Sequence, residues 1–150
     1  MAKIKRKKVK CQENYCVTCG LCNVACSIAY TGDTALFLDK NYKMNARNSL
    51  EKRDAISFMN ACQHCDDPEC IKACVTGAIY KRADGIVVID GEKCIGCWSC
   101  MLVCPHNAIK MGVSKKGRKI SVKCDLCVDK EFQACVEICP NKALAVVECE

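Results

Sequence analysis

Four groups of closely spaced cysteines constrain this chain more than any other feature of its sequence. The first and third groups share the spacing C-x2-C-x2-C-x3-C, the second has C-x2-C-x4-C-x3-C and the fourth has C-x2-C-x7-C-x3-C. Their members are Cys16, Cys19, Cys22 and Cys26; Cys62, Cys65, Cys70 and Cys74; Cys94, Cys97, Cys100 and Cys104; and Cys124, Cys127, Cys135 and Cys139. Of the 18 cysteines, only Cys11 and Cys149 stand outside the groups.

Thiols at this density serve either disulfides or metal. Disulfides need an oxidising compartment, but the basic start MAKIKRKKVK is not followed by the apolar segment of a secretory signal. There is also no run of 18 apolar residues that could span a membrane. We therefore expect a cytoplasmic protein without a membrane span, in which the cysteines stay reduced and bind metal.

The composition agrees with a fold held together by metal. Cysteine accounts for 12% of the residues, and without it the apolar fraction falls from 51% to about 39%. Because 150 residues of this kind supply a thin side-chain core, we expect folding to depend on the bound metal. The formal charge of +6 suggests a nucleic-acid partner. If each of the four cysteine groups binds one oxidised [4Fe–4S] cluster, which with its thiolates carries about −2, the net charge of the protein becomes about −2. We expect no nucleic-acid partner.

The segments that flank the cysteine groups repeat as well. The second, third and fourth groups end in CVTGAI, CPHNAI and CPNKAL, and extended runs follow at 85–90, 119–123 and 144–148. The three-residue gap before each fourth cysteine predicts the first turn of a short helix, which Pro105 and Pro140 stop in two groups. The cysteine-free segment from Tyr30 to Asn60 is interpreted as an insertion that packs over the metal core or faces a partner. A solvated loop with a short helix is the alternative.

The spacings favour iron–sulfur clusters over zinc. A C-x2-C-x2-C loop places three thiolates at three corners of a [4Fe–4S] cube, and in two-cluster ferredoxins the last cysteine of the opposite run supplies the fourth. Gly20 and Gly96 lie inside such loops, where a missing Cβ lets the backbone approach closely. Structural zinc sites combine two C-x2-C pairs, often with His, and this chain has only two His. A zinc-ribbon interaction module, in which the same thiols bind zinc, is the alternative function.

The number of thiols points to electron transfer. Sixteen cysteines supply four ligands to each of four cubes, which leaves no iron open to a substrate. The radical-initiating spacing C-x3-C-x2-C and a Gly-rich phosphate loop are both absent from the sequence. We expect no catalytic residue, although an enzyme that uses one cluster as its catalyst is a second rival.

The chain resembles the four-cluster ferredoxin-like subunits of anaerobic redox complexes. The segments CVTCGLCNVACS, CQHCDDPECIKAC, CIGCWSCMLVCP and KCDLC carry this resemblance, which covers about residues 11 to 149. Such subunits serve carbon monoxide dehydrogenase, aldehyde oxidoreductase, formate dehydrogenase, hydrogenase and the dimethyl sulfoxide reductase group. The cysteine motifs of this chain look most like those of the electron-transfer subunit of carbon monoxide dehydrogenase. The resemblance implies a single-electron relay between a catalytic subunit and a second carrier or flavoprotein, within a protein complex.

By the same resemblance, the fold is α+β, with two bacterial-ferredoxin-like halves related by pseudo-twofold symmetry. Half one would span about 1–30 plus 110–150, half two about 58–109, and the insertion about 30–58. The implied ligand sets are Cys16, Cys19, Cys22 and Cys139; Cys124, Cys127, Cys135 and Cys26; Cys62, Cys65, Cys70 and Cys104; and Cys94, Cys97, Cys100 and Cys74. Spacing alone does not choose this pairing, because 19 residues separate the second group from the third and also the third from the fourth. Pairing of the first group with the second, and the third with the fourth, stays open.

Several single residues also receive an interpretation. Trp98 stands beside Cys97 rather than in its place, so a complete cube is expected there, with Trp98 packed over it. His64 is interpreted as a solvated loop residue, with tuning of a cluster as the alternative, and His106 as structural. Cys11 and Cys149 are expected to be buried free thiols, and KIKRKKVK to be a strand with a solvated basic face.

Overall fold

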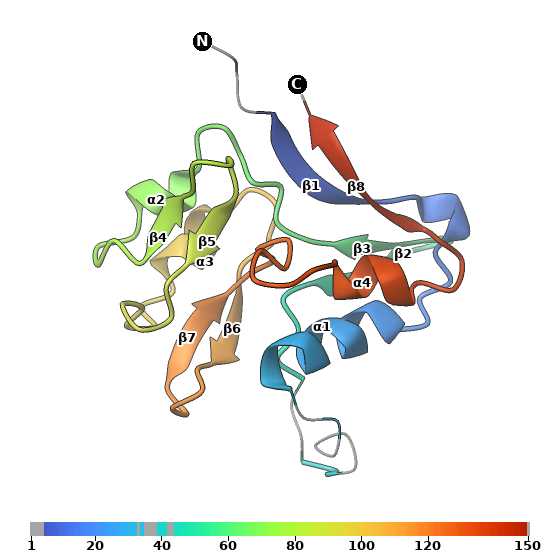
Figure 1. The fold of residues 1–150 in the computed structure, drawn as a ribbon, viewed down its shortest axis with the longest axis horizontal. Helices are drawn as coiled ribbons and strands as arrows, with labels where there is room; N and C mark the ends of the chain where they lie inside the picture. The colour runs from blue at the N-terminus through green and yellow to red at the C-terminus, as the bar shows by residue number, and fades with distance from the viewer. Residues whose placement is uncertain (1–4, 33, 35–38, 42–43, 150) are drawn as a thin grey trace.

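Four separate two-stranded antiparallel sheets make up the framework of the part of the chain that the structure describes (Figure 1). The structure is a computed structural model that describes residues 5–32, 34, 39–41 and 44–149. The strands are β1 (Arg6–Cys11), β2 (Ser49–Arg53), β3 (Ile56–Asn60), β4 (Ile79–Lys81), β5 (Val87–Ile89), β6 (Lys110–Val113), β7 (Lys119–Val122) and β8 (Leu144–Cys149). They pair as β1–β8, β2–β3, β4–β5 and β6–β7. The strands expected within 85–90, 119–123 and 144–148 are confirmed.

The pairing of β1 with β8 joins the two ends of the chain. Lys7 lies opposite Glu148 and Val9 opposite Val146 in this ladder. Val9 is buried, whereas Lys7 and Lys10 on the same strand are exposed. The expected strand is therefore confirmed over residues 6–10, where Arg6, Lys8 and Lys10 share the face opposite Val9 and Lys10 is exposed; residues 3 and 4 of KIKRKKVK lie outside the described residues.

Each cysteine group carries one short helix that contains its third cysteine. The helices are α1 (Leu21–Thr31), α2 (Glu69–Lys72), α3 (Ser99–Val103) and α4 (Ala134–Ile138), and a single 3-10 turn, η1, spans Glu13–Tyr15. Helices α3 and α4 end at the residue before Cys104 and Cys139, each of which precedes a proline that disfavours further helix. No proline follows Cys26, and α1 continues to Thr31, where Gly32, with φ of +72°, forms its C-cap.

The helices pack in pairs that follow the cysteine groups. Helix α1 contacts α4, and α2 contacts α3. Figure 1 shows α1, α4 and the sheets β1–β8 and β2–β3 on one side of the molecule, and α2, α3 and the sheets β4–β5 and β6–β7 on the other. In the described part of the chain, no helix is both long enough and apolar enough to cross a bilayer.

The segment interpreted as an insertion contributes the β2–β3 hairpin. Met59 is buried in the main apolar cluster, and Leu50 packs against that cluster. For residues 49–60 the alternative of a solvated loop with a short helix is therefore wrong, because these side chains have an apolar face to cover. Residues 33, 35–38 and 42–43 of this segment lie outside the described residues.

Candidate metal centres

Within the described residues, four cavities are each lined by four cysteines. We name each cavity by the second cysteine of the group that contributes three thiols to it. The Cys19 cavity holds Cys16, Cys19, Cys22 and Cys139; the Cys127 cavity holds Cys26, Cys124, Cys127 and Cys135; the Cys65 cavity holds Cys62, Cys65, Cys70 and Cys104; and the Cys97 cavity holds Cys74, Cys94, Cys97 and Cys100. These sets are the ones that the resemblance implies. That the thiols bind iron stays a prediction.

The cavities exchange their fourth thiols in pairs. Cys26 leaves the loop of the first group and lines the Cys127 cavity, while Cys139 lines the Cys19 cavity in return. Cys74 and Cys104 make the same exchange between the Cys97 and Cys65 cavities. The packing of α1 on α4 and of α2 on α3 produces this exchange, because each fourth cysteine lies within or just beyond its helix.

The four C-x2-C loops share one backbone conformation. The residue just before the second cysteine has a positive φ in every loop: 56° at Thr18, 45° at His64, 70° at Gly96 and 57° at Leu126. This left-handed step turns successive N–H groups toward one side and creates a concave surface that attracts anions. Four loops of different sequence therefore adopt the shape expected around an anionic group.

Backbone N–H groups reach the cysteine sulfurs in all four cavities. The pairs are Arg47 with Cys26 at 3.2 Å, His64 with Cys62 at 3.4 Å, Ala108 with Cys104 at 3.5 Å, Ser121 with Cys94 at 3.4 Å, Leu126 with Cys124 at 3.5 Å and Ala143 with Cys139 at 3.3 Å. Such donors stabilise a thiolate, and they are among the interactions that set the potential of an iron–sulfur cluster.

The repeated endings of three groups form the same turn. The N–H of Gly77, Asn107 or Lys142 donates to the carbonyl of the fourth cysteine three residues earlier, at 3.2 to 3.3 Å. All three residues have a positive φ, between 49° and 65°. The repeat in CVTGAI, CPHNAI and CPNKAL thus encodes a turn that directs the following N–H groups back to the cysteine.

The two loop glycines differ in what they require. A Cβ at Gly96 would lie 2.6 Å from the Lys119 carbonyl oxygen, so the expected close backbone approach is confirmed there, against strand β7. At Gly20 the nearest atom to a Cβ would be on Leu50, 4.0 Å away. The expected close approach is therefore wrong for Gly20, where φ of +82° is what favours glycine.

Burial raises the pKa of several of these thiols, which makes them hard to ionise without a nearby positive charge. It raises the pKa of Cys22 and of Cys70 to about 11, and that of Cys135 to about 12. The exposed Cys97 behaves differently, because hydrogen bonds from Ser99 lower its pKa. Thiolates are the metal-ligating form, so the buried thiols suit a cationic iron core that offsets their burial.

The sulfurs surround a space rather than a single point. In the described part of the chain, no three side chains of His, Cys, Asp or Glu converge closely enough to hold one metal ion. A structural zinc ion needs four ligands at about 2.0 to 2.3 Å. Each of the four cavities is lined by four thiols, and the 18 cysteines form no disulfide in the structure.

The sequence does not indicate the polar network that lies beside the Cys127 cavity. The guanidinium of Arg47 lies 2.8 Å from Asp125 Oδ2 and stacks 3.4 Å above the Tyr30 ring. The Tyr30 hydroxyl donates to Asp125 Oδ1, which also accepts the N–H of Cys127 at 3.0 Å. Arg47 and Tyr30 lie in the segment without cysteines, and no spacing in the sequence links them to Asp125.

The interpretation of His64 as a solvated loop residue is wrong. Its side chain is fully buried, and Nδ1 accepts the N–H of Val87 at 3.1 Å. Burial lowers the pKa of His64 to about 3, so the ring is neutral at pH 7. Because Nδ1 is an acceptor, Nε2 carries the hydrogen, and it has no hydrogen-bond partner among the described residues.

The remaining single residues are placed as follows. Trp98 caps α3 with φ of 65° and is half-buried beside Gly96, and its packing over a cube remains a prediction. His106 is exposed, and its carbonyl accepts a hydrogen bond from Asn60 at 2.9 Å. Cys149 lies opposite Arg6 at the end of the terminal sheet. Cys11 lies in β1, and partial burial raises its pKa. Both thiols are free, but they are half-buried, so the expected full burial is wrong.

Comparison with known proteins places this geometry in a family. The model of the 4Fe-4S dicluster domain matches residues 54–149, which contain the second, third and fourth cysteine groups. An iron-sulfur protein of Rhodospirillum rubrum is 38% identical over 150 residues, covering 90% of this chain and 78% of that protein. One of the subunits of the sulfite dehydrogenase of Allochromatium vinosum is 33% identical over 155 residues, covering 87% of this chain and 63% of its own length.

A solved structure shows the same fold. A chain of the active site complex BamBC of benzoyl coenzyme A reductase aligns with a TM-score of 0.52 at 18% sequence identity. The alignment covers 99% of this chain and 82% of the other. At this identity the likeness concerns the fold alone, a small mixture of helices and strands.

Proposed function

The chain belongs to the 4Fe-4S dicluster domain family, and from this premise we propose that it relays single electrons through four [4Fe–4S] clusters. The observation that carries the proposal is the presence of four cavities, each lined by four free thiols. Each proposed ligand set is the set that lines one cavity. The family model accounts for a dicluster domain, and the further clusters rest on the cavities themselves.

The residues of the chain have three tasks in this proposal. The thiolates hold the clusters, the N–H groups of the C-x2-C loops and of the repeated turns stabilise the sulfurs, and the apolar side chains exclude water. When bound, the clusters supply one-electron redox chemistry. We propose no catalytic residue in this chain, so substrate chemistry belongs to a partner protein.

We also propose that the two sides of the molecule in Figure 1 are two ferredoxin-like halves related by pseudo-twofold symmetry. The exchange of Cys26 with Cys139, and of Cys74 with Cys104, supports this arrangement. Residues 110–122 were expected in half one, but Ser121 of β7 contacts both Cys94 and Cys100. We therefore assign β6 and β7 to half two.

The partner that we propose is the catalytic subunit of an oxidoreductase complex, with a second carrier or flavoprotein on the other side of the relay. The similarity to a component of a sulfite dehydrogenase supports a partner of this class. Carbon monoxide dehydrogenase is the partner that the cysteine motifs favour, although neither of the two relatives described above bears that name. Cys19 and Cys97 are the two exposed ligands, one in each half, and they mark the edges where electrons would enter and leave.

Metal and sulfide analysis of the anaerobically purified chain tests this function. About sixteen irons and sixteen sulfides per chain, with uptake of about four electrons in a reductive titration, are expected for four cubes. Zinc without sulfide would overturn the proposal in favour of the interaction module. Capture of the tagged chain under anaerobic conditions then identifies the catalytic partner.

A further inference from the structure

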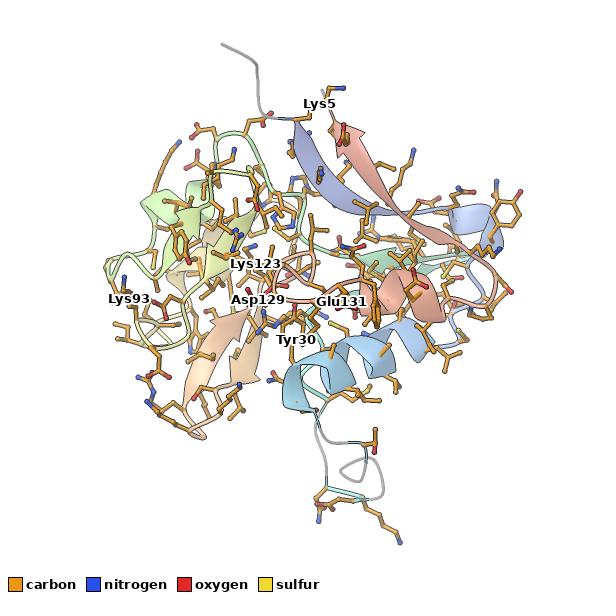
Figure 2. All side chains as sticks on the ribbon, in the orientation of Figure 1. Lys5, Tyr30, Lys93, Lys123, Asp129 and Glu131 are labelled. Carbon is orange, nitrogen blue, oxygen red and sulfur yellow. The ribbon has the colours of Figure 1, made fainter. Side chains whose placement is uncertain are left out.

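The largest fully buried side chain in the described part of the chain is that of Lys123, which directly precedes Cys124. Its exposed fraction is 2%. Figure 2 shows it near the middle of the molecule, between the two sides defined above. A lysine so deeply buried is unusual, because removal of an ammonium group from water costs several kcal/mol unless anionic partners replace the water.

The ammonium nitrogen of Lys123 joins residues of two cavities. Nζ lies 3.4 Å from Cys62 Sγ, which lines the Cys65 cavity, and 3.0 Å from the carbonyl oxygen of Cys124, which lines the Cys127 cavity. It also donates to the carbonyl of Val87. Three acceptors match the three N–H bonds of an ammonium group, whereas a neutral amine has only two.

No carboxylate neutralises this charge. Within the ranges that the structure describes, Lys123 takes part in no ion pair with Asp or Glu. The positive charge of Lys123 acts on Cys70 and on Cys124, one in each of the two cavities, and opposes the effect of burial on both.

We propose that Lys123 is a positioning residue for electron crossing between the two halves, and that its charge holds up the reduction potential of the two clusters on either side of it. This inference rests on the proposed function. A fixed positive charge favours the more negative, reduced state of a neighbouring cluster, and a hydrogen bond to a ligating sulfur acts in the same direction. The Cys19 and Cys97 cavities do not contact Lys123 in the structure, so their clusters should feel it less.

The test uses Lys123→Gln and Lys123→Met in the complete chain, with Lys116→Gln as the matched control. Lys116 is exposed and pairs with Glu92 at 2.8 Å, so its replacement removes the same charge at the surface. Dithionite supplies the electrons, one for each centre, and Lys123 gains or loses neither a bond nor a proton. Redox titration followed by electron spin resonance gives the midpoint potential of each centre, and iron analysis gives cluster content.

We expect both Lys123 variants to retain about sixteen irons while the midpoint potential of one or two centres falls. The other centres and all centres of Lys116→Gln should keep the wild-type values. Unchanged potentials in a fully loaded Lys123→Gln would overturn the inference. A wild-type chain that binds no iron would instead overturn the proposed function.

A second measurement covers the case in which the Lys123 variants fail to take up iron. Pulsed spin resonance on the reduced wild-type protein, labelled with ¹⁵N-lysine, detects a lysine nitrogen hydrogen-bonded to a cluster ligand. A ¹⁵N coupling on at least one centre is expected. The same coupling in Lys116→Gln would show that the signal does not come from the nitrogen of Lys116. Absence of any lysine coupling would overturn the inference.

Discussion

Replacement of Gly96 by alanine isolates the close approach of β7 to a cysteine loop. The backbone at Gly96 has φ of +70°, and a Cβ there would lie 2.6 Å from the carbonyl oxygen of Lys119. Gly77 is the matched control, because it has φ of +65°, belongs to the Cys74 turn of the same Cys97 cavity, and has no atom within 4 Å of a built Cβ. The two substitutions therefore share the conformational cost and differ in the steric one.

The magnitude follows from these two terms. A left-handed conformation costs an alanine about 1 to 2 kcal/mol relative to glycine, and this applies at both positions. The overlap at Gly96 is with backbone, which cannot rotate away, so the loop or β7 must shift, at a further cost of about 1 to 3 kcal/mol. With about 2 to 4 °C per kcal/mol for a chain of this size, Gly96→Ala should lose its clusters about 5 °C below Gly77→Ala.

The assay is the loss of the visible charge-transfer absorbance of the anaerobic protein, heated at one fixed rate. A fixed rate is necessary because cluster loss is irreversible, so only the difference between the two variants is interpreted. Equal transition temperatures for Gly96→Ala and Gly77→Ala would refute the reasoning, since they would mean that β7 does not press on the loop.

Three other predictions concern stability. Arg47→Met leaves Asp125 without its cation and should lower the free energy of unfolding by about 3 kcal/mol, the low end of the range for breaking a buried ion pair, because this pair is only partly buried. The loss should appear as faster bleaching of one centre in mild denaturant, and an unchanged bleaching rate would count against the network. His64→Leu leaves the N–H of Val87 without its acceptor and should cost about 1 to 3 kcal/mol by the same assay, whereas the exposed His106→Leu should be neutral; equal effects would contradict the burial of His64. Oxidative chelation of the iron should abolish cooperative thermal unfolding in circular dichroism, and a sharp transition in the apo chain would show that side chains alone suffice.

The sequence was sufficient for the parts of the molecule that repeat. The cysteine groups predicted the short helices, and the flanks at 85–90, 119–123 and 144–148 predicted strands, because each repeat encodes a turn and an extended run locally. The pairing of the groups needed the resemblance, since equal spacers of 19 residues allowed two arrangements. In the structure, the packing of α1 on α4 and of α2 on α3 brings together the groups that line each cavity, and helix packing is a long-range property.

The buried polar residues could not be predicted in the same way. His64 lies within a polar C-x2-C loop and Lys123 at the end of a mixed strand, positions at which polar side chains are usually solvated. Each is buried by a segment distant in the sequence, with Val87 providing a partner to both. Arg47, Tyr30 and Asp125 likewise meet only after α1 and the Cys127 loop come together.

In the proposed arrangement, each cluster takes three cysteines from one sequence group and its fourth from another group. Iron counts in paired cysteine variants measure this exchange. Cys26 and Cys124 line the same cavity, whereas Cys26 and Cys19 come from one sequence group but line different cavities. If one missing ligand prevents assembly of its cube, Cys26→Ala/Cys124→Ala should retain about twelve irons per chain and Cys26→Ala/Cys19→Ala about eight. The reverse result, about eight irons in the first variant and about twelve in the second, would contradict the account.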